Sequence, residues 1–338
     1  MSFFKKTIRD LPLNGQTVLV RADYNVPLNG DGTISDDLRI RASLPTLRYL
    51  VERGCKVVII SHLGRPEGHD PALSLAPIGE RLSELLDKSV EFIDETIGEK
   101  VYQTVRKAPR GSVLLLENLR YYPEEEADDM AFAKAIAQSV RPDYFVQDGF
   151  GVVHRAHAST RAITLCVPAV AGLLLEKEYV TITRAMECPK RPFVAVMGGA
   201  KVSDKITVIE RFVSIADTIL IGGAMANTFL AYKGKSVGKS KVEPDQSEVL
   251  DKLYLAASKK VGAEHVDEFI ILPTDVAIAK KLDVAEPRIE RSSDHIEADD
   301  IALDIGAVSI ERFTSIAAKA HTVVWNGTLG YAEFPEFA

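Results

Sequence analysis

Short apolar runs alternate along the chain with segments whose apolar residues recur at helical spacing. The runs 17–21 and 57–60 are rich in β-branched residues and predict buried strands. Between them, apolar residues such as Leu44 and Leu47 share one face of a predicted helix from Leu38 to Arg53. This strand–helix–strand rhythm indicates a parallel sheet with helices on both faces, and therefore an α/β fold.

The rhythm runs through the first half of the chain and restarts in the second half. Further helices are predicted over 75–86 and 128–138, and further strands over 112–116, 144–146, 193–197, 218–221, 269–272 and 322–325, with helices between the later strands. The longer helical pattern from Leu173 to Met186 predicts a helix that connects two domains. We therefore predict an N-terminal domain over 1–171, an interdomain helix over 172–188 and a C-terminal domain over 189–338.

Composition narrows the class of protein. With 338 residues, 46% apolar and 26% charged, the chain resembles an ordinary globular protein of two domains. The net charge of −7 argues against nucleic acid or an anionic membrane as a partner. No signal peptide or transmembrane helix is expected, because no long apolar run is present. Three scattered cysteines predict neither a disulfide framework nor a cysteine-based metal site, as in a reducing cytoplasm.

Basic side chains follow the predicted strands of the first half at the point where each strand ends. His62 and Arg65 follow one strand, Arg120 a second and Arg155 a third, while Arg39 opens a helix where its charge opposes the helix dipole. The carboxyl ends of parallel strands meet at one edge of a sheet, so these groups can converge there. Four arginines would repel one another without an anionic ligand. The pattern predicts a site for a small, multiply charged anion such as a phosphorylated carboxylic acid.

Other polar residues near these strand ends carry weaker signals. Asp23 and Asn25 suit the binding of sugar-like hydroxyls, but both residues also favour a plain turn before a proline. A metal site at Asp148, His154 and His157 is the rival interpretation of the last segment. No third clustered histidine or cysteine supports it, so anion binding is favoured over a metal centre.

Glycine turns follow two successive strands of the second half. The first turn, Gly198-Gly199-Ala200-Lys201, opens a helix and is followed by Lys205. We expect its backbone N–H groups and the N-terminus of the helix to face a phosphate. The second turn contains Gly222 and Gly223. Neither turn matches a Walker A or a GxGxxG loop, and each alone is compatible with a tight strand-to-helix connection, but the pair suits a nucleotide.

The last predicted strand ends in Trp325-Asn326-Gly327-Thr328. Asn326 is a candidate to contact a transferred phosphoryl group, and Glu333 a candidate to accept hydroxyl groups of a ribose. Trp325, the only tryptophan, is expected to pack in the core.

Taken in order, these motifs resemble those of the phosphoglycerate kinase family over essentially the whole chain. The matching segments are 21–27 (RADYNVP), 37–41 (DLRIR), 61–66 (SHLGRP), 117–120 (ENLR), 154–159 (HRAHAS), 198–205 (GGAKVSDK) and 325–327 (WNG). The resemblance implies two Rossmann-like three-layer α/β/α domains with mainly parallel sheets on either side of a cleft. It also implies a monomeric, cytoplasmic, hinge-bending enzyme of glycolysis that uses Mg²⁺ with ATP or ADP and transfers a phosphoryl group reversibly to the carboxylate of 3-phosphoglycerate.

The resemblance further implies a role for each candidate residue. Binding of 3-phosphoglycerate is expected at Asp23, Asn25, Arg39, His62, Arg65, Arg120 and Arg155. Binding of the nucleotide is expected at Gly198, Ala200, Lys201, Lys205, Gly222, Gly223, Asn326 and Glu333. Arg39, Lys201 and Lys205 are the expected catalytic residues. Positioning and charge neutralisation suffice for such a transfer, without a covalent intermediate.

The chain departs from the family pattern in three places. Thr328 stands where a proline is usual, and Gln147-Asp148-Gly149-Phe150 replaces Asn-Asp-Ala-Phe. The chain stops at Ala338, whereas the family continues with a glycine-rich phosphate loop, an Mg²⁺-binding aspartate and a segment that returns to the first domain. We therefore expect a truncated chain or an impaired enzyme, with no metal ligand identified in this chain. A homologue that binds phosphoglycerate without transferring phosphate is the alternative.

Overall fold

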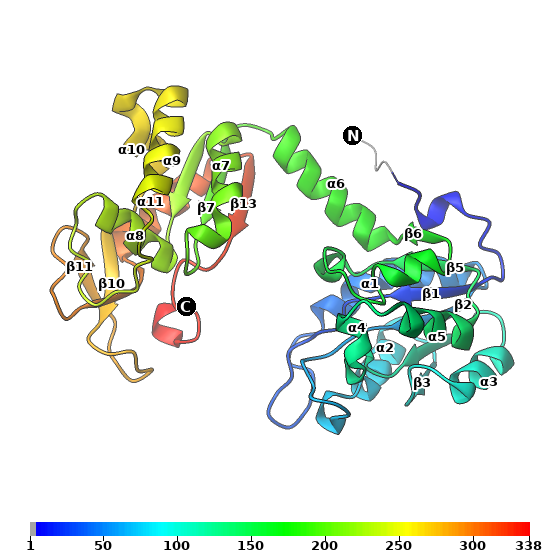
Figure 1. Cartoon of the computed structure of the whole chain (residues 1–338). Coiled ribbons are helices and arrows are strands. Elements are labelled where there is room, and N and C mark those ends of the chain that lie inside the picture. The colour runs from blue at the N-terminus through cyan, green and yellow to red at the C-terminus, as the bar shows by residue number, and fades with distance from the viewer. Residues whose placement is uncertain (1–4) are drawn as a thin grey trace. The chain divides into compact units, whose positions relative to one another are not determined.

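The structure is a computed structural model that describes residues 5–338. It divides into two compact units, one that ends at Ile182 and one that begins at Thr183 (Figure 1). The division falls inside helix α6 (Leu173–Glu187), in the segment where the sequence predicts an interdomain helix. None of the helices within the described residues is long and apolar enough to cross a membrane.

The N-terminal unit contains one six-stranded sheet in which all paired strands are parallel. The strand order is β3-β4-β2-β1-β5-β6. The strands are β1 (Thr17–Arg21), β2 (Lys56–Ile60), β3 (Val90–Ile93), β4 (Val113–Leu116), β5 (Tyr144–Gln147) and β6 (Ala169–Ala171). The central position of β1 and β2 brings the loops that follow them together at the carboxyl edge of the sheet.

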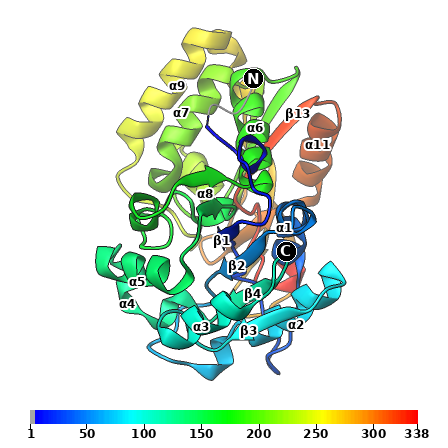
Figure 2. The ribbon, with the colours of Figure 1, turned by 90° about the vertical axis from the view of Figure 1, so that its right-hand side faces the viewer.

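Helices cover both faces of this sheet, because successive strand residues point to opposite sides. Besides α6, the helices are α1 (Leu38–Glu52), α2 (Ala76–Leu86), α3 (Glu99–Lys107), α4 (Pro123–Glu126) and α5 (Met130–Val140). Val57 and Ile59 of β2 pack in a core with α1 and α2, whereas Val58 and Ile60 pack in a second core with α3 and α5. Figure 2 shows α1 and α2 on one side of the strands and α5 on the other.

The C-terminal unit contains a four-stranded parallel sheet and a separate antiparallel sheet of three strands. The parallel sheet has the order β13-β7-β8-β9, with β7 (Phe193–Met197), β8 (Thr218–Ile221), β9 (Ile270–Ile271) and β13 (Thr322–Asn326). The antiparallel sheet has the order β11-β10-β12, with β10 (Asp275–Ala279), β11 (Ile289–Ser292) and β12 (Ile301–Ile305).

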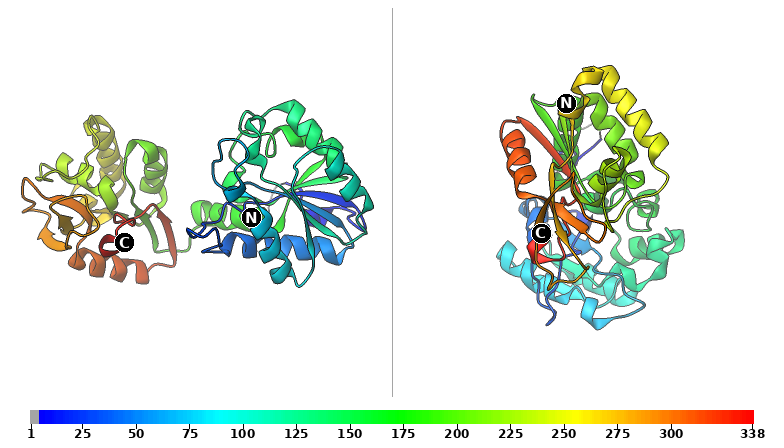
Figure 3. Two further views of the ribbon diagram at one scale, coloured as in Figure 1. Left: turned by 90° about the horizontal axis from the view of Figure 1, so that it is seen from below. Right: turned by 90° about the vertical axis from the view of Figure 1, so that its left-hand side faces the viewer.

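Helices also lie on both faces of the parallel sheet in this unit. They are α7 (Ile206–Ile215), α8 (Gly223–Tyr232), α9 (Ser247–Val261), α10 (Val266–Phe269) and α11 (Ala307–Ala318). Phe193 and Met197 pack with α7, α8 and α9, whereas Val194 and Val196 pack with Phe313 of α11. The right-hand view of Figure 3 shows α11, in orange, and the helices α7 and α9 on opposite sides of the strands.

Single turns of 3₁₀ helix connect many of these elements in both units. They are η1 (Ile8–Asp10), η2 (Pro71–Leu73), η3 (Leu119–Tyr121), η4 (Phe150–Val152), η5 (Ala162–Leu165), η6 (Ser203–Lys205), η7 (Ala263–His265) and η8 (Pro335–Phe337). The loops that carry Arg120, Arg155 and Lys205 all contain or adjoin such a turn.

The predicted α/β class with mainly parallel sheets is confirmed. The prediction of helices alone between the strands 269–272 and 322–325 is wrong, because β10, β11 and β12 form a sheet there. Polar residues such as Glu290 and Asp304 interrupt the apolar pattern of these strands and hide it. The edge strands β3 and β6 are also absent from the prediction.

Candidate active site

Basic side chains gather at the carboxyl edge of the N-terminal sheet. His62 follows β2 and is 2% exposed, and Arg120 follows β4 and is 8% exposed. Burial, and with it the nearby charges of Arg21, Arg120, Arg155 and Arg39, lowers the pKa of His62 to about 2. Burial and the charges of Arg155 and Arg65 likewise lower the pKa of Arg120. The predicted cluster of cations is therefore present at one edge of the sheet.

Arg39 lies in the first turn of α1 and is paired with the carboxylate of Asp23, which follows β1. The distance from Arg39 Nη1 to Asp23 Oδ2 is 2.6 Å, and the arginine side chain is 50% exposed. A Cβ atom on Gly151 would lie 2.6 Å from the same Asp23 oxygen. Any side chain at this position would therefore displace the Asp23 carboxylate.

The loop after β2 is fixed by an amide and a guanidinium. Asn25 Oδ1 accepts a hydrogen bond of 2.8 Å from the N–H of Gly64. Arg120 Nη1 donates to the carbonyl of Gly64 at 2.5 Å, and Arg120 Nη2 is 3.1 Å from Glu126 Oε1. Asn118 donates to the carbonyl of Leu63 at 2.8 Å. These bonds hold the loop that carries His62 and the exposed Arg65.

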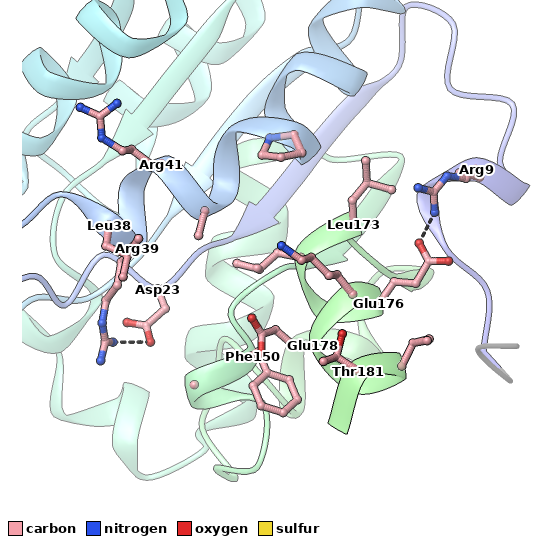
Figure 4. A pocket seen from close by; sticks show the side chains of 16 residues that line it. Arg9, Asp23, Leu38, Arg39, Arg41, Phe150, Leu173, Glu176, Glu178 and Thr181 are labelled. Carbon is pink, nitrogen blue, oxygen red and sulfur yellow. Dashed lines mark hydrogen bonds and ion pairs between the residues drawn. The ribbon is translucent and has the colours of Figure 1, made fainter. Parts of the chain in front are cut away.

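Two pockets of the N-terminal unit lie beside these groups. Asp23, Arg39, Phe150 and Lys177 are among the residues that line a pocket of about 960 Å³ between the start of α1 and α6 (Figure 4). Arg65 and Arg120 line a smaller pocket of about 310 Å³. Arginines thus face open volume on both sides of the cluster.

In the C-terminal unit, the loops after β7, β8 and β13 are joined by main-chain hydrogen bonds. Gly198 N–H donates to the carbonyl of Asn326, Gly199 N–H to Thr328 and Gly223 N–H to Leu329, at 2.9, 2.8 and 2.8 Å. A Cβ atom on Gly198 would lie 2.1 Å from the Thr328 carbonyl oxygen. The glycines are therefore required by the contact between the loops.

Two lysines of the first glycine loop differ in their surroundings. Lys205 Nζ donates to the carbonyls of Gly198 and Asn326 at 2.8 and 3.2 Å, and burial lowers its pKa. Lys201 is exposed. The N–H groups of Val202 and Ser203 donate to Glu243 Oε2 at 2.6 and 3.1 Å. The sequence predicts that the N–H groups after the glycine turn face a ligand. For Val202 and Ser203 this prediction is wrong, because the Glu243 carboxylate already accepts from both N–H groups.

The end of the last strand differs from its prediction in one respect. Trp325 is 64% exposed and Nε1 donates to the Gly327 carbonyl at 2.7 Å, so its predicted core position is wrong. The strand β13 lies at the edge of its sheet, which leaves this ring uncovered. The side chains of Asn326 and Glu333 are exposed, as is Ala200, while Gly222 is buried beneath Leu329.

A family model described as phosphoglycerate kinase matches residues 8–338. The chain belongs to the phosphoglycerate kinase family. Phosphoglycerate kinase of Dictyoglomus turgidum is 45% identical over 99% of this chain and 83% of that protein. The enzyme of Chloroflexus aurantiacus is 47% identical over 99% of this chain and 82% of that protein. The structure of phosphoglycerate kinase from Pyrococcus horikoshii, 34% identical, covers 98% of this chain and 83% of that chain with a TM-score of 0.79.

Among the residues implied by the resemblance to phosphoglycerate kinases, the structure brings most of the N-terminal set together. Arg39 contacts Asp23. Asn25 and Arg120 both contact Gly64. The charges of Arg39, Arg120 and Arg155 act on His62. The roles of these residues in binding remain predictions. Sequence reasoning missed the buried residues Arg21, Glu125 and Ser159 behind this set, and also Glu243.

Magnesium, which the resemblance to phosphoglycerate kinases implies, needs oxygen ligands. Among the described residues, the groups that could supply three metal ligands are limited to Glu297, Asp299 and Asp300. Lys280 Nζ lies 2.9, 2.9 and 2.6 Å from these carboxylates, so a cation of the chain already neutralises them. The described residues beside the glycine loops therefore do not form a magnesium site of their own.

Proposed function

We propose that the chain transfers a phosphoryl group reversibly between ATP and the carboxylate of 3-phosphoglycerate. The observation that carries this proposal is the group of arginines around the buried His62 at one edge of the N-terminal sheet. Like charges held together in this way are costly unless an anion of several charges binds among them. The substrate named by the family has both a phosphate and a carboxylate, which fits this set of donors.

The N-terminal unit would bind 3-phosphoglycerate with rigid and mobile donors. Arg120 and His62 are buried and held by hydrogen bonds, so we infer that they anchor the anion in one position. Arg39 is half exposed and paired with Asp23, so its guanidinium can exchange this carboxylate for a substrate oxygen. Charge that develops on the transferred group would be stabilised by such a donor. Asp23 and Asn25 would then accept from the substrate hydroxyl.

The C-terminal unit would bind ATP or ADP at the three glycine-bearing loops. We infer that the exposed Lys201 binds the nucleotide phosphates and that Lys205 contacts the transferred group after exchange of its carbonyl partners. Gly198, Gly222 and Gly223 would hold the three loops together beneath the nucleotide, with Asn326 and Glu333 at its exposed side. Magnesium would supply charge neutralisation on the nucleotide, although the described residues beside these loops do not provide a cluster of ligands for it.

The remaining expectations are part of the same proposal. We infer that residues 1–171 form the phosphoglycerate-binding domain, 172–188 the connecting helix and 189–338 the nucleotide-binding domain. A monomeric, cytoplasmic enzyme that closes by hinge bending stays a prediction. A homologue that binds phosphoglycerate without transfer is the second candidate, favoured by the lack of a group of metal ligands among the described residues beside the glycine loops.

The test combines a coupled assay of phosphoryl transfer with calorimetry of each ligand on the same chain. We expect turnover and separate binding of 3-phosphoglycerate and ADP. Binding of 3-phosphoglycerate without turnover would support the binding-only candidate. Absence of 3-phosphoglycerate binding from a folded chain would contradict both candidates.

A further inference from the structure

Arg21, the last residue of β1, is buried behind the anion-binding residues. Its side chain is 1% exposed, although it carries a positive charge. A buried charge is costly unless it is paired and its donors are used. None of the roles inferred above for Asp23, His62 or Arg120 accounts for this guanidinium.

A closed network compensates the charge of Arg21. Nε donates to Ser159 Oγ at 2.7 Å, and Nη2 lies 3.9 Å from Glu125 Oε1. Ser159 N–H in turn donates to Glu125 Oε2 at 2.9 Å. The carboxylate of Glu125 is as deeply buried as the guanidinium. The network therefore fixes the plane of the Arg21 guanidinium from one side.

The other side of this guanidinium faces His62. Arg21 Nη2 lies 3.2 Å from His62 Nδ1. An arginine side chain has donors only and keeps its proton in proteins, so Nδ1 must be the acceptor in this pair. A neutral imidazole with an acceptor at Nδ1 carries its proton at Nε2. Within residues 5–338 no hydrogen bond is recorded at His62 Nε2, which leaves this N–H for a ligand.

Four arginines act on the His62 ring, while the nearby carboxylate of Glu125 is turned to Arg21. Arg21, Arg120, Arg155 and Arg39 all act on the ring, and with burial they lower its pKa to about 2. The ring thus stays neutral wherever phosphate and carboxylate ligands are ionised. It contributes a hydrogen-bond donor without adding a further charge to a crowded set of cations.

We propose that Arg21 is a positioning residue of the anion site, which fixes His62 as the Nε2–H tautomer so that the ring presents a permanent donor to a ligand oxygen. This inference rests on the proposed function, because it assigns His62 to 3-phosphoglycerate. It also defines the ligand atom, since an Nε2–H group requires an acceptor such as a carboxylate or phosphate oxygen and disfavours a hydroxyl that must donate. His62 is not an acid–base catalyst in this arrangement.

The first test needs no substrate. Nitrogen-15 NMR of the histidine rings, assigned by loss of signals in His62→Ala, should show the proton of His62 at Nε2. We expect no titration of this ring from pH 5 to pH 8. A proton at Nδ1, or a titration in this range, would overturn the proposal whatever the activity of the chain.

The second test removes the donor to Nδ1. Arg21→Met alone would leave Glu125 buried without its partner, so the variant of choice is Arg21→Met/Glu125→Gln, which removes both charges together. Glu125→Gln alone keeps the donor to His62 but leaves Arg21 without its carboxylate, so it serves as the control once its circular dichroism shows that it is folded. In the double variant we expect a mixture of tautomers at His62 and about ten-fold weaker binding of 3-phosphoglycerate, with unchanged ADP binding.

The outcomes separate this proposal from the proposed function. A folded double variant, shown by its circular dichroism, with the Nε2–H tautomer retained and binding unchanged would contradict the positioning role. If the unmodified chain shows the Nε2–H tautomer but does not bind 3-phosphoglycerate, the proposed function fails and the assignment of His62 to that substrate fails with it. Inorganic phosphate, measured in parallel, shows whether the donor acts on the phosphate end of the ligand.

Discussion

The candidate site of the N-terminal unit is built from side chains, whereas that of the C-terminal unit is built from main chain. At the first, buried guanidinium groups and one imidazole hold the loops after β2 and β4. At the second, glycine N–H groups bind the carbonyls of neighbouring loops, and Lys205 closes the arrangement through two more carbonyls. The first site should therefore be sensitive to loss of a charge, and the second to gain of a single carbon atom.

The largest effect is expected from loss of one mobile charge in the N-terminal unit. Arg39→Ala should lower turnover by roughly 10²- to 10³-fold, because a donor to developing charge is removed. The thermal midpoint should change little, since the side chain is 50% exposed. A coupled assay checks the prediction, and Arg41→Ala, two residues further along α1 and paired with Asp37, is the matched control. Turnover close to normal in Arg39→Ala would exclude a catalytic role.

In the C-terminal unit, the sharpest test adds an atom where no side chain fits. In Gly198→Ala the new Cβ would lie 2.1 Å from the Thr328 carbonyl oxygen, so the two loops must separate. We expect a loss of stability of about 2–3 kcal/mol, in the range of other overpacked sites, and loss of ADP binding. Gly234→Ala is the control, because no atom lies within 4 Å of its added Cβ, although its φ of +78° adds local strain. Chemical denaturation and calorimetry measure both changes.

A smaller effect should show that the two sites bind different ligands. Lys201→Ala should weaken ADP binding roughly ten-fold, the effect of losing one hydrogen bond with a charged group, and leave 3-phosphoglycerate binding nearly unchanged. Lys239→Ala serves as a control for the loss of one surface charge in the same unit. Equal losses for both ligands would contradict the assignment of one ligand to each unit.

A change in stability with pH, without a change in ligand binding, is expected from a carboxylate inside the N-terminal unit. Asp148 Oδ1 accepts from Thr46 Oγ1 at 2.8 Å and from the N–H of Leu174 at 3.0 Å, at the start of α6. Burial raises the pKa of Asp148 to about 6, so the folded state keeps this proton longer than the unfolded chain. As pH rises from about 4 to above 6, this group therefore reduces stability, by at most about 3 kcal/mol.

Asp148→Asn keeps the acceptor oxygen but removes the titration. The difference in unfolding free energy between the variant and the unmodified chain should shift in favour of the variant as pH rises through 4–6. Denaturation measured at several pH values gives this difference directly. A constant difference over the whole range would show that Asp148 does not titrate there.

Much of the fold could be predicted because its strands are uniformly apolar. The runs that became β1, β2, β4, β7 and β8 are buried on both faces, so their composition alone identifies them. The antiparallel sheet was missed because its strands include charged residues such as Arg291 and Asp304, which pair with Asp300 and Arg288 respectively. Charged residues that form ion pairs within a sheet interrupt the alternation of apolar and polar positions, so such strands are not recognised from the sequence pattern.

The same distinction applies to the candidate sites. The exposed or strand-end residues of the anion cluster could be named from the sequence, because an arginine directly after a parallel strand indicates a ligand site at that edge of the sheet. Glu125 could not, since it stands in the acidic run Glu124–Glu126 and reads as a solvated surface, yet its side chain is only 1% exposed. Glu243 was hidden for a related reason, because its partners Val202 and Ser203 are forty residues away in the chain.

The exposed indole at the end of β13 gives the protein an optical reporter. Trp325 is the only tryptophan, and its N–H is bonded to Gly327, one residue from the Asn326 carbonyl that accepts from Lys205. Fluorescence excited selectively in tryptophan therefore arises from one loop of the C-terminal unit, with the long-wavelength emission of a hydrated ring. Quenching by iodide or acrylamide would follow movements of this loop alone, against a background in which the N-terminal unit is dark.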